Sequence, residues 1–167
     1  GPWLSSAKSY FSKNNSAVDD FREYMSGKKN RQEWLETAIK WKSHESYGKI
    51  NVEEYMSEHQ GDPDAKEIWQ YYFRVMMWVK SIFIKYRKQM KGIEWGILYN
   101  EHKEQILTLE PDKIEERVSE LMKHPDVQRK KGIYPYILNG DESHLNLRAF
   151  DEKTKIEKYE EQGGKCA

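Results

Sequence analysis

The feature that most constrains the fold of this chain is a run of apolar residues that recur every three or four positions. The run consists of Ala65, Ile68, Trp69, Tyr72, Met76, Val79, Phe83, Tyr86 and Met90. Such spacing places the side chains on one side of an α-helix. Asp62 and Pro63 suit a helix start, and Gly92 follows the last apolar position. The run therefore predicts one long helix of roughly 25 residues, about 40 Å in length.

The predicted long helix is expected to lie at the centre of the fold. Further apolar residues widen its apolar surface beyond one stripe, namely Val75, Trp78, Ile82 and Ile84. A helix that is apolar on more than one side is contacted from more than one side. Cap residues and helical apolar spacing predict shorter helices around it, at 16–26, 30–42, 51–60, 93–106 and 110–124, with a polar loop at 44–49.

Composition favours helices and a packed core. Aromatic residues make up 13% of the 167 positions, and they supply the large apolar area that a disordered chain lacks. Only 10 Gly and 5 Pro occur, which argues against a turn-rich β-sandwich or barrel. The nearest candidate for a strand, 134–138, contains Pro135. We therefore predict an all-α protein, a multi-helix bundle around one long central helix, with an irregular C-terminal part and a connector helix.

The predicted organisation is one domain with a short appendage, as is usual at this length. Gly1 and Pro2 resemble the remnant of a cleaved tag, and we leave them out of the fold prediction. Residues 3–125 are expected to form the helical bundle core, and 126–150 short helices and turns. Residues 151–167 are expected to form a polar connector helix, because Ile156 and Tyr159 are its few apolar members. The chain is thus interpreted as a piece of a longer protein.

Neither a membrane span nor a signal peptide is recognisable in the sequence. No apolar run approaches the roughly 18 residues that a span needs, and the first residues lack the succession of basic, apolar and small positions. We therefore expect a cytoplasmic protein without a membrane partner. The single cysteine, Cys166, excludes an internal disulfide and any Cys-rich zinc site made by this chain alone.

Residues that could carry catalysis are scattered along the chain. The five histidines show no metal-binding spacing. Only two of them are kept as candidates for a functional role, His144 and His59, which begins the run His59-Gln60-Gly61-Asp62. Adjacent acids such as Glu53 and Glu54 point in directions about 100° apart on a helix, so they do not converge on one substrate atom. No phosphate-binding glycine loop or nucleophile motif occurs. This chain is therefore predicted to be non-catalytic by itself.

Basic residues are concentrated in two stretches, although 28 basic residues face 28 acidic ones in the whole chain. Residues 80–91 contain five Lys and Arg and no acid, and 123–131 contain four against Asp126. If the two stretches share a face, they can contact several phosphates of a DNA backbone. The predicted contacts are Arg74, Lys80, Lys85, Arg87, Lys88, Lys91, Arg129, Lys130 and Lys131. Two other interpretations stay open: a solvated helix end stabilised by its own dipole, or an aromatic pocket for a flipped base.

Several segments of the chain carry the pattern of one known family. They are Trp69-Gln70-Tyr71-Tyr72-Phe73, Gly92-Ile93-Glu94-Trp95-Gly96-Ile97-Leu98-Tyr99-Asn100, Gln32-Glu33-Trp34-Leu35, Leu145-Asn146-Leu147-Arg148-Ala149-Phe150 and Tyr159-Glu160-Glu161-Gln162-Gly163-Gly164-Lys165-Cys166. Together they resemble the middle part of bacterial restriction-type proteins of the GmrSD-like family. Members of that family join an N-terminal ParB-like domain with a D-G-Q-Q-R motif to a C-terminal HNH endonuclease domain.

The resemblance implies what the full-length parent contains. In that family the segment ending in Gly-x-Cys enters a C-x-x-C zinc knuckle, so Cys166 would be the first zinc thiolate in the parent. Zinc, and a divalent metal such as magnesium, are implied for the HNH domain, where metal-assisted hydrolysis would cleave DNA. The D-G-Q-Q-R motif and the HNH histidines do not occur in this sequence, so no catalytic residue is carried over.

These observations together predict the central helical domain of a DNA-targeting restriction or phage-defence endonuclease. The domain would position sensor and nuclease domains, with 151–167 leading into a truncated HNH domain, and would contact the backbone of double-stranded DNA. The alternative is a scaffold without DNA contact, in which the aromatic face of the long helix forms a homodimer or docks the flanking domains.

Overall fold

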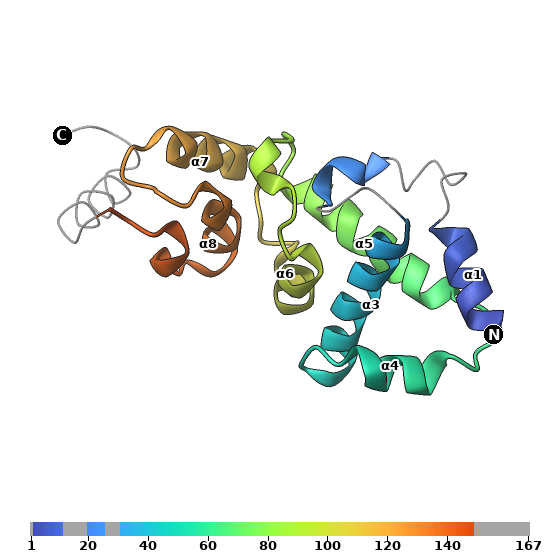
Figure 1. Cartoon of the computed structure of the whole chain (residues 1–167). Helices are drawn as coiled ribbons and strands as arrows, with labels where there is room; N and C mark the ends of the chain where they lie inside the picture. The colour runs from blue at the N-terminus through green and yellow to red at the C-terminus, as the bar shows by residue number, and fades with distance from the viewer. Residues whose placement is uncertain (1, 12–19, 26–30, 149–167) are drawn as a thin grey trace. The chain divides into compact units, whose positions relative to one another are not determined.

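The computed structural model describes residues 2–11, 20–25 and 31–148 of the chain (Figure 1). Within these ranges the regular elements are seven α-helices and five short 3₁₀ turns, and no strand is present. The predicted all-α fold is therefore confirmed. The chain forms two compact units, Gly1–Pro111 and Asp112–Ala167.

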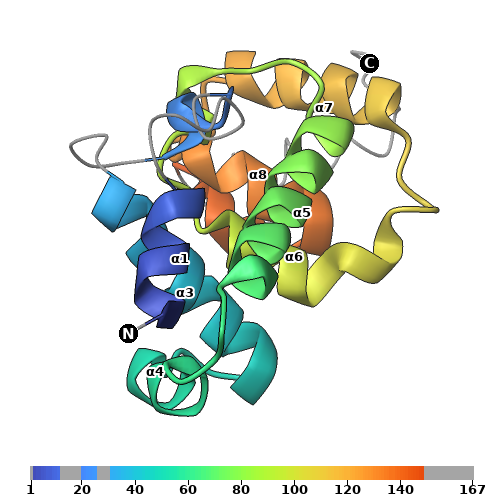
Figure 2. The same cartoon turned by 90° about the vertical axis from the view of Figure 1, so that its right-hand side faces the viewer.

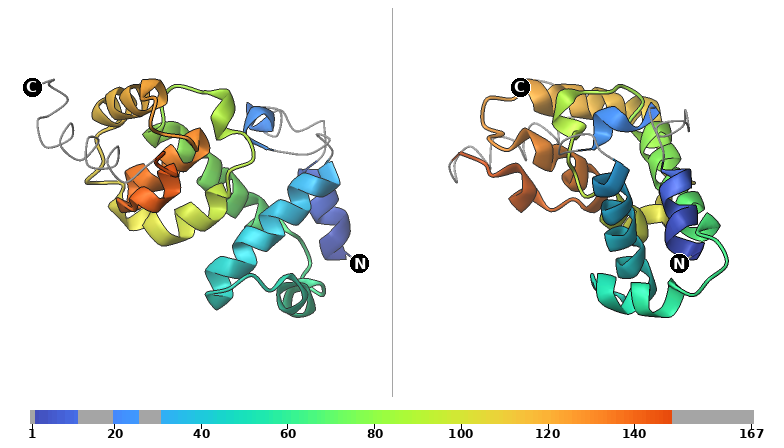
Figure 3. Two further views of the ribbon diagram at one scale, coloured as in Figure 1. Left: turned by 60° about the vertical axis from the view of Figure 1, so that its left-hand side comes forward. Right: turned by 45° about the vertical axis from the view of Figure 1, so that its right-hand side comes forward.

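The first unit is arranged around one helix, α5. Its α-helices are α1 (Pro2–Tyr10), α3 (Arg31–Tyr47), α4 (Val52–His59), α5 (Lys66–Ile82) and α6 (Trp95–His102). Its 3₁₀ turns are η1 (Arg22–Tyr24), η2 (Lys88–Met90) and η3 (Lys103–Gln105). Helix α5 packs against α1, α3 and α6 (Figure 2), while α1 and α3 also contact each other (Figure 3). This arrangement confirms the central position predicted for the helix.

Helix α5 buries a wide apolar face. The residues that it contributes to the core are Ile68, Tyr71, Tyr72, Val75, Met76, Trp78, Val79 and Ile82. Aromatic contacts fix its neighbours: the Phe11 ring centroid lies 5.2 Å from that of Tyr72, and the ring of Trp41 is stacked on Tyr72 at 6.3 Å. The helix therefore holds the unit together from more than one side, as expected for such a pattern.

The predicted length of this helix is wrong, because α5 has 17 residues and ends at Ile82 instead of continuing to position 90. The last helical hydrogen bond runs from the Phe83 amide to the Val79 carbonyl, and Phe83 then adopts ψ 82. Because the chain leaves the helix at this point, the Phe83 ring packs on Trp95 with a distance of 5.6 Å between the ring centroids, and Met90 is fully buried in η2. Burial of these side chains against distant residues overrides the local helical spacing.

The ends of the other helices follow local chemistry. The Asn51 side chain accepts a hydrogen bond from the Glu54 amide, which confirms the predicted cap of α4. Helix α3 runs on to Tyr47, so the loop predicted at 44–49 is wrong for residues 44–47. Gly48 ends the helix with φ +74, and its amide donates to the His44 carbonyl at 2.9 Å. This left-handed stop is typical of glycine.

Helix α1 is absent from the sequence-based prediction. It buries Trp3 and Ala7, and the ring of Trp3 lies 6.4 Å from that of Tyr55. The Ser6 hydroxyl accepts a hydrogen bond from the Ala65 amide just before α5. Two buried residues on one short helix give too weak a pattern to be recognised, and contacts made 50 or more positions away stabilise it.

The second unit contains α7 (Pro111–Lys123), η4 (Lys130–Gly132), α8 (Ile133–Asn139) and η5 (Glu142–Leu145). Both the amphipathic helix predicted at 110–124 and the brief helices predicted after 126 are confirmed. The border between the units groups α7 with the segment after 125, and the division into 3–125 and 126–150 stays a prediction. The predicted connector helix and Cys166 lie outside the described residues, as does the start of the helix predicted at 16–26.

Candidate nucleic-acid interface

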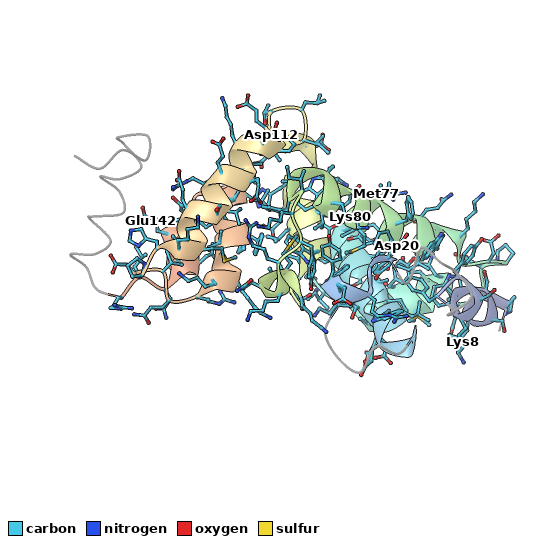
Figure 4. All side chains as sticks on the ribbon, turned by 90° about the horizontal axis from the view of Figure 1, so that it is seen from above. Lys8, Asp20, Met77, Lys80, Asp112 and Glu142 are labelled. Carbon is cyan, nitrogen blue, oxygen red and sulfur yellow. The ribbon has the colours of Figure 1, made fainter. Side chains whose placement is uncertain are left out.

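The predicted DNA contacts of the first unit lie on the outward side of α5 and on the chain that follows it. The side of α5 opposite its buried face carries Lys66, Gln70, Phe73, Arg74, Met77, Lys80 and Ser81, all exposed or half-exposed. These positions share one side of a helix by their spacing. Two of them, Met77 and Lys80, are labelled in Figure 4. Lys85 and Lys88 follow on the connection after α5, and both are exposed.

Three cations elsewhere in this unit, Lys40, Lys42 and Lys103, are paired with a carboxylate. The Lys40 ammonium lies 2.7 Å from Glu94, and the Lys103 ammonium lies 3.1 Å from Glu45. Like Lys8, Lys49 and Lys66, the four predicted contacts Arg74, Lys80, Lys85 and Lys88 have no carboxylate within ion-pair distance in the described part of the chain. We call these four residues the basic surface. Their charges are available to an anionic partner.

The connection that carries Lys85 and Lys88 is fastened to η1. The Tyr86 hydroxyl donates a hydrogen bond to the Glu23 carbonyl at 2.7 Å, and the Gly92 amide donates to the Tyr24 carbonyl at 2.9 Å. The rings of Tyr24 and Tyr86 meet edge to face at 5.1 Å. Burial, and then the neighbouring Tyr86, raise the pKa of Tyr24. The two lysines are therefore presented by an anchored segment.

Arg87 and Lys91 differ from the other predicted contacts. Both are half-exposed, and each makes an interaction within the chain. The Arg87 carbonyl accepts a hydrogen bond from the Met90 amide at 2.9 Å, which closes the η2 turn. We therefore do not include these two residues in the basic surface.

In the second unit, the predicted contact Lys130 caps a helix. Its ammonium donates to the main-chain carbonyls of His124 at 2.7 Å and Leu121 at 3.4 Å, at the C-terminal end of α7. Burial, and then the nearby Arg148 charge, lower the pKa of Lys130. A cation at this end of a helix interacts favourably with the helix dipole, and here it adds to the hydrogen bonds that the two carbonyls accept from the His124 and Val127 amides. Lys130 therefore has a structural role in this unit.

The other two predicted contacts of the second unit are exposed. The Arg129 amide donates to the Leu145 carbonyl at 3.1 Å, while its guanidinium has no carboxylate partner within the described ranges. Lys131 makes an interaction within the chain. That the basic stretches of the two units share one face stays a prediction.

The histidines singled out from the sequence are held by neighbouring side chains. The His59 ring lies 2.9 Å from the Asp62 carboxylate through Nδ1 and is stacked on Tyr55 at 4.2 Å. His144 lies 3.1 Å from the Asn139 amide through Nε2. Among the described residues, no group of three or more His, Cys, Asp or Glu is placed to hold a metal. These histidines therefore fasten the ends of local turns.

A polar network between α3, α5 and the η3 turn was not predicted from the sequence. Lys42, which is 9% exposed, pairs with Glu45 one turn away and lies 3.4 Å from Glu67. The Glu45 carboxylate also accepts from Lys103 at 3.1 Å. Burial alone would raise the pKa of Glu45, but the hydrogen bonds and the positive charges of Lys42 and Lys103 together outweigh it and lower that pKa. The only sequence signal is the spacing of Lys42 and Glu45.

A second group of hydrogen bonds, made by the neutral side chain of Asn100, lies beside this network, where the Lys42 ammonium is 5.4 Å from the centre of the Tyr71 ring. Its amide group donates to the Trp41 carbonyl at 3.0 Å and accepts from the Tyr71 hydroxyl at 2.6 Å. Asn100 thereby joins α6 to both α3 and α5. Such satisfied networks fix the geometry of packed helices and leave no reactive group free, so we interpret this one as structural.

No helix in the described ranges has the length and apolar character needed to cross a lipid bilayer. Comparison of the chain with protein-family models, with curated proteins and with solved structures finds no match. The resemblance to GmrSD-like proteins therefore stays a prediction.

Proposed function

We propose that this chain is the central helical domain of a DNA-targeting restriction or phage-defence endonuclease, and that it contacts the backbone of double-stranded DNA. The observation that carries the DNA contact is the basic surface, whose four cations have no carboxylate partner among the described residues. The restriction context, the cytoplasmic location and the role in positioning sensor and nuclease domains rest on the sequence interpretation.

The proposed contact is to phosphates and not to bases. Each Lys or Arg that meets a phosphate releases condensed counterions, so affinity falls steeply as salt rises. With 28 basic and 28 acidic residues the whole chain has no net charge, so attraction to DNA has to come from a local excess of cations. Arg74 and Lys80 on α5, followed by Lys85 and Lys88, provide such an excess.

Metal chemistry belongs to the proposed parent protein. A structural zinc site needs four ligands, and the sequence offers one thiolate, Cys166, which lies outside the described residues. We therefore derive no catalytic step for this chain and assign the zinc and the magnesium to the proposed HNH domain.

The test is a fluorescence-anisotropy titration with a labelled DNA duplex between about 50 and about 200 mM salt. The triple variant Lys80→Gln, Lys85→Gln, Lys88→Gln should bind more weakly, and its slope of log affinity against log salt should be shallower by about 2 to 3. The matched control, Lys8→Gln, Lys49→Gln, Lys113→Gln, removes the same charge from exposed lysines outside both basic stretches. Equal losses in both variants, or no binding by the wild type near 50 mM salt, would rule out the proposed contact.

The alternative function, a docking or dimerisation scaffold, is favoured by a different observation. Phe73 and Met77 on the outward side of α5 are 39% and 46% exposed, and DNA phosphates offer no apolar partner for them. Sedimentation velocity over a range of protein concentrations tests the homodimer, because a strict monomer excludes the homodimer but neither the DNA contact nor the docking of flanking domains.

A further inference from the structure

The outward side of α5 combines apolar and basic side chains in an ordered way. Phe73 and Met77 are four positions apart, so their side chains are neighbours on the helix. Arg74 precedes Met77 by three positions and Lys80 follows it by three, which places one cation about 4.5 Å along the axis on either side. We call Phe73, Arg74, Met77 and Lys80 the α5 stripe. Figure 4 labels Met77 and Lys80 on this helix.

The α5 stripe rests on a rigid base of rings. The Phe73 ring centroid lies 5.8 Å from that of Phe21 and 6.2 Å from that of Trp69. The Lys80 ammonium lies 5.2 Å above the Phe21 ring. Because these contacts already restrict the rotamers of Phe73 and Lys80, a partner that binds here loses less conformational entropy than it would on mobile side chains.

Charge decides which kind of partner fits this surface. The one acid on the same side of α5, Glu67, lies at its start and is 3.4 Å from the Lys42 ammonium. In a dimer formed through two copies of the stripe, Arg74 and Lys80 of one copy would lie against the same two cations of the other copy, and this repulsion costs free energy. A partner with carboxylates on either side of an apolar row satisfies both the cations and the apolar side chains.

We propose that the α5 stripe docks an acidic amphipathic helix of a partner protein. Apolar side chains of that helix, four positions apart, pack on Phe73 and Met77. Its carboxylates, about two turns apart, meet Arg74 and Lys80, which are about 9 Å apart along the axis. The inference goes beyond the proposed DNA contact and does not depend on it, although both use Arg74 and Lys80.

The probe is a fluorescein-labelled helical peptide of about 18 residues, long enough to form a helix in water. It has leucines on one face and glutamates on both sides of them. A second peptide has the same composition in an order that scatters the leucines around the helix. The full chain should bind the amphipathic peptide about tenfold more tightly than the scattered one, because only the first presents a continuous apolar row.

Two variants distinguish binding at the α5 stripe from nonspecific hydrophobic binding elsewhere on the protein. Met77→Ser should weaken the binding of the amphipathic peptide about fivefold, because the peptide can no longer bury the apolar area of the Met77 side chain. Leu107→Ser removes a leucine that is 94% exposed elsewhere in the unit and should leave the affinity unchanged. Circular dichroism confirms that both variants are folded. Equal binding of the two peptides, binding of neither, or no effect of Met77→Ser would overturn the proposal.

Two further measurements separate this inference from the functions proposed above. If the chain dimerises in sedimentation and Met77→Ser disperses the dimer, a second copy occupies the stripe and the acidic helix is the wrong partner. Met77→Ser should leave DNA affinity unchanged, because a thioether makes no phosphate contact. A third outcome is that the protein binds the peptide in a Met77-dependent way and yet binds no DNA in any assay. That result would refute the proposed DNA contact and support the docking site.

Discussion

At the scale of single residues, Gly96 sets how closely two helices of the first unit approach. It lies on α6, and a Cβ atom added there would come within 2.2 Å of Cγ of Trp41 on α3. The sequence marks this glycine only as a weak point in a helical segment. The missing side chain makes room for the indole, and the partner that requires it is 55 positions away.

Gly96→Ala should therefore destabilise the protein although alanine favours helix. The added methyl group has to displace the Trp41 ring or move α6, and such overpacking costs about 1 to 3 kcal/mol. Urea unfolding followed by circular dichroism measures the change. Gly61→Ala is the matched control, because nothing lies within 4 Å of a Cβ at that position. Equal stability of Gly96→Ala and Gly61→Ala would show that α6 yields without cost.

At the scale of elements, α5 shows both the strength and the limit of sequence periodicity. The spacing of three and four correctly predicts the central helix from Ile68 to Val79, because the buried face depends on local repetition. The spacing continues through Phe83, Tyr86 and Met90, so it contains no sign of the end at Ile82. The hydrogen bond from Tyr86 to the Glu23 carbonyl, 63 positions away, belongs to the fold that replaces the last turns.

The C-terminal end of α7 gives a prediction at the same scale. Lys130→Met keeps the aliphatic stem but removes the ammonium that donates to the His124 and Leu121 carbonyls. We expect a loss of about 1 kcal/mol, since the ammonium is half-exposed and water replaces part of its hydrogen bonding. Faster amide hydrogen exchange in the last turn of α7 should accompany the loss.

Arg129→Gln is the control for this cap. Its guanidinium has no carboxylate partner in the residues that the structure covers, so the exchange rates in α7 should stay as in the wild type. If Lys130→Met exchanges like the wild type while its DNA affinity falls as much as that of Arg129→Gln, Lys130 is a phosphate contact and not a cap.

At the scale of the whole molecule, the pairing of charges decides which basic residues can serve a partner. The sequence correctly shows where Lys and Arg are dense, and Lys80, Lys85 and Lys88 come from such a stretch. It does not show that Lys40 and Lys103 are neutralised, because the acids that pair with them are distant: Lys40 meets Glu94 across 54 positions and Lys103 meets Glu45 across 58. The role of Lys130 was missed for a related reason, since carbonyl groups at a helix end leave no mark in composition.

The Glu45 network makes the stability of the molecule depend on pH. Burial raises the pKa of Glu45, but the hydrogen bonds and positive charges of Lys42 and Lys103 together outweigh it and hold that pKa below its ordinary value of 4.5. The folded state therefore binds this proton more weakly than the unfolded chain. The charge of Glu45 therefore stabilises the folded state above about pH 4.5, and this stabilisation is lost as the pH falls through the lower folded-state pKa.

Glu45→Gln should lower the free energy of unfolding by about 1 kcal/mol at pH 7. The difference in stability between this variant and the wild type should shrink below about pH 4. Urea titrations at both pH values measure this, with the exposed Glu104→Gln as control. A difference that stays constant with pH would mean that the lysines do not stabilise the Glu45 charge.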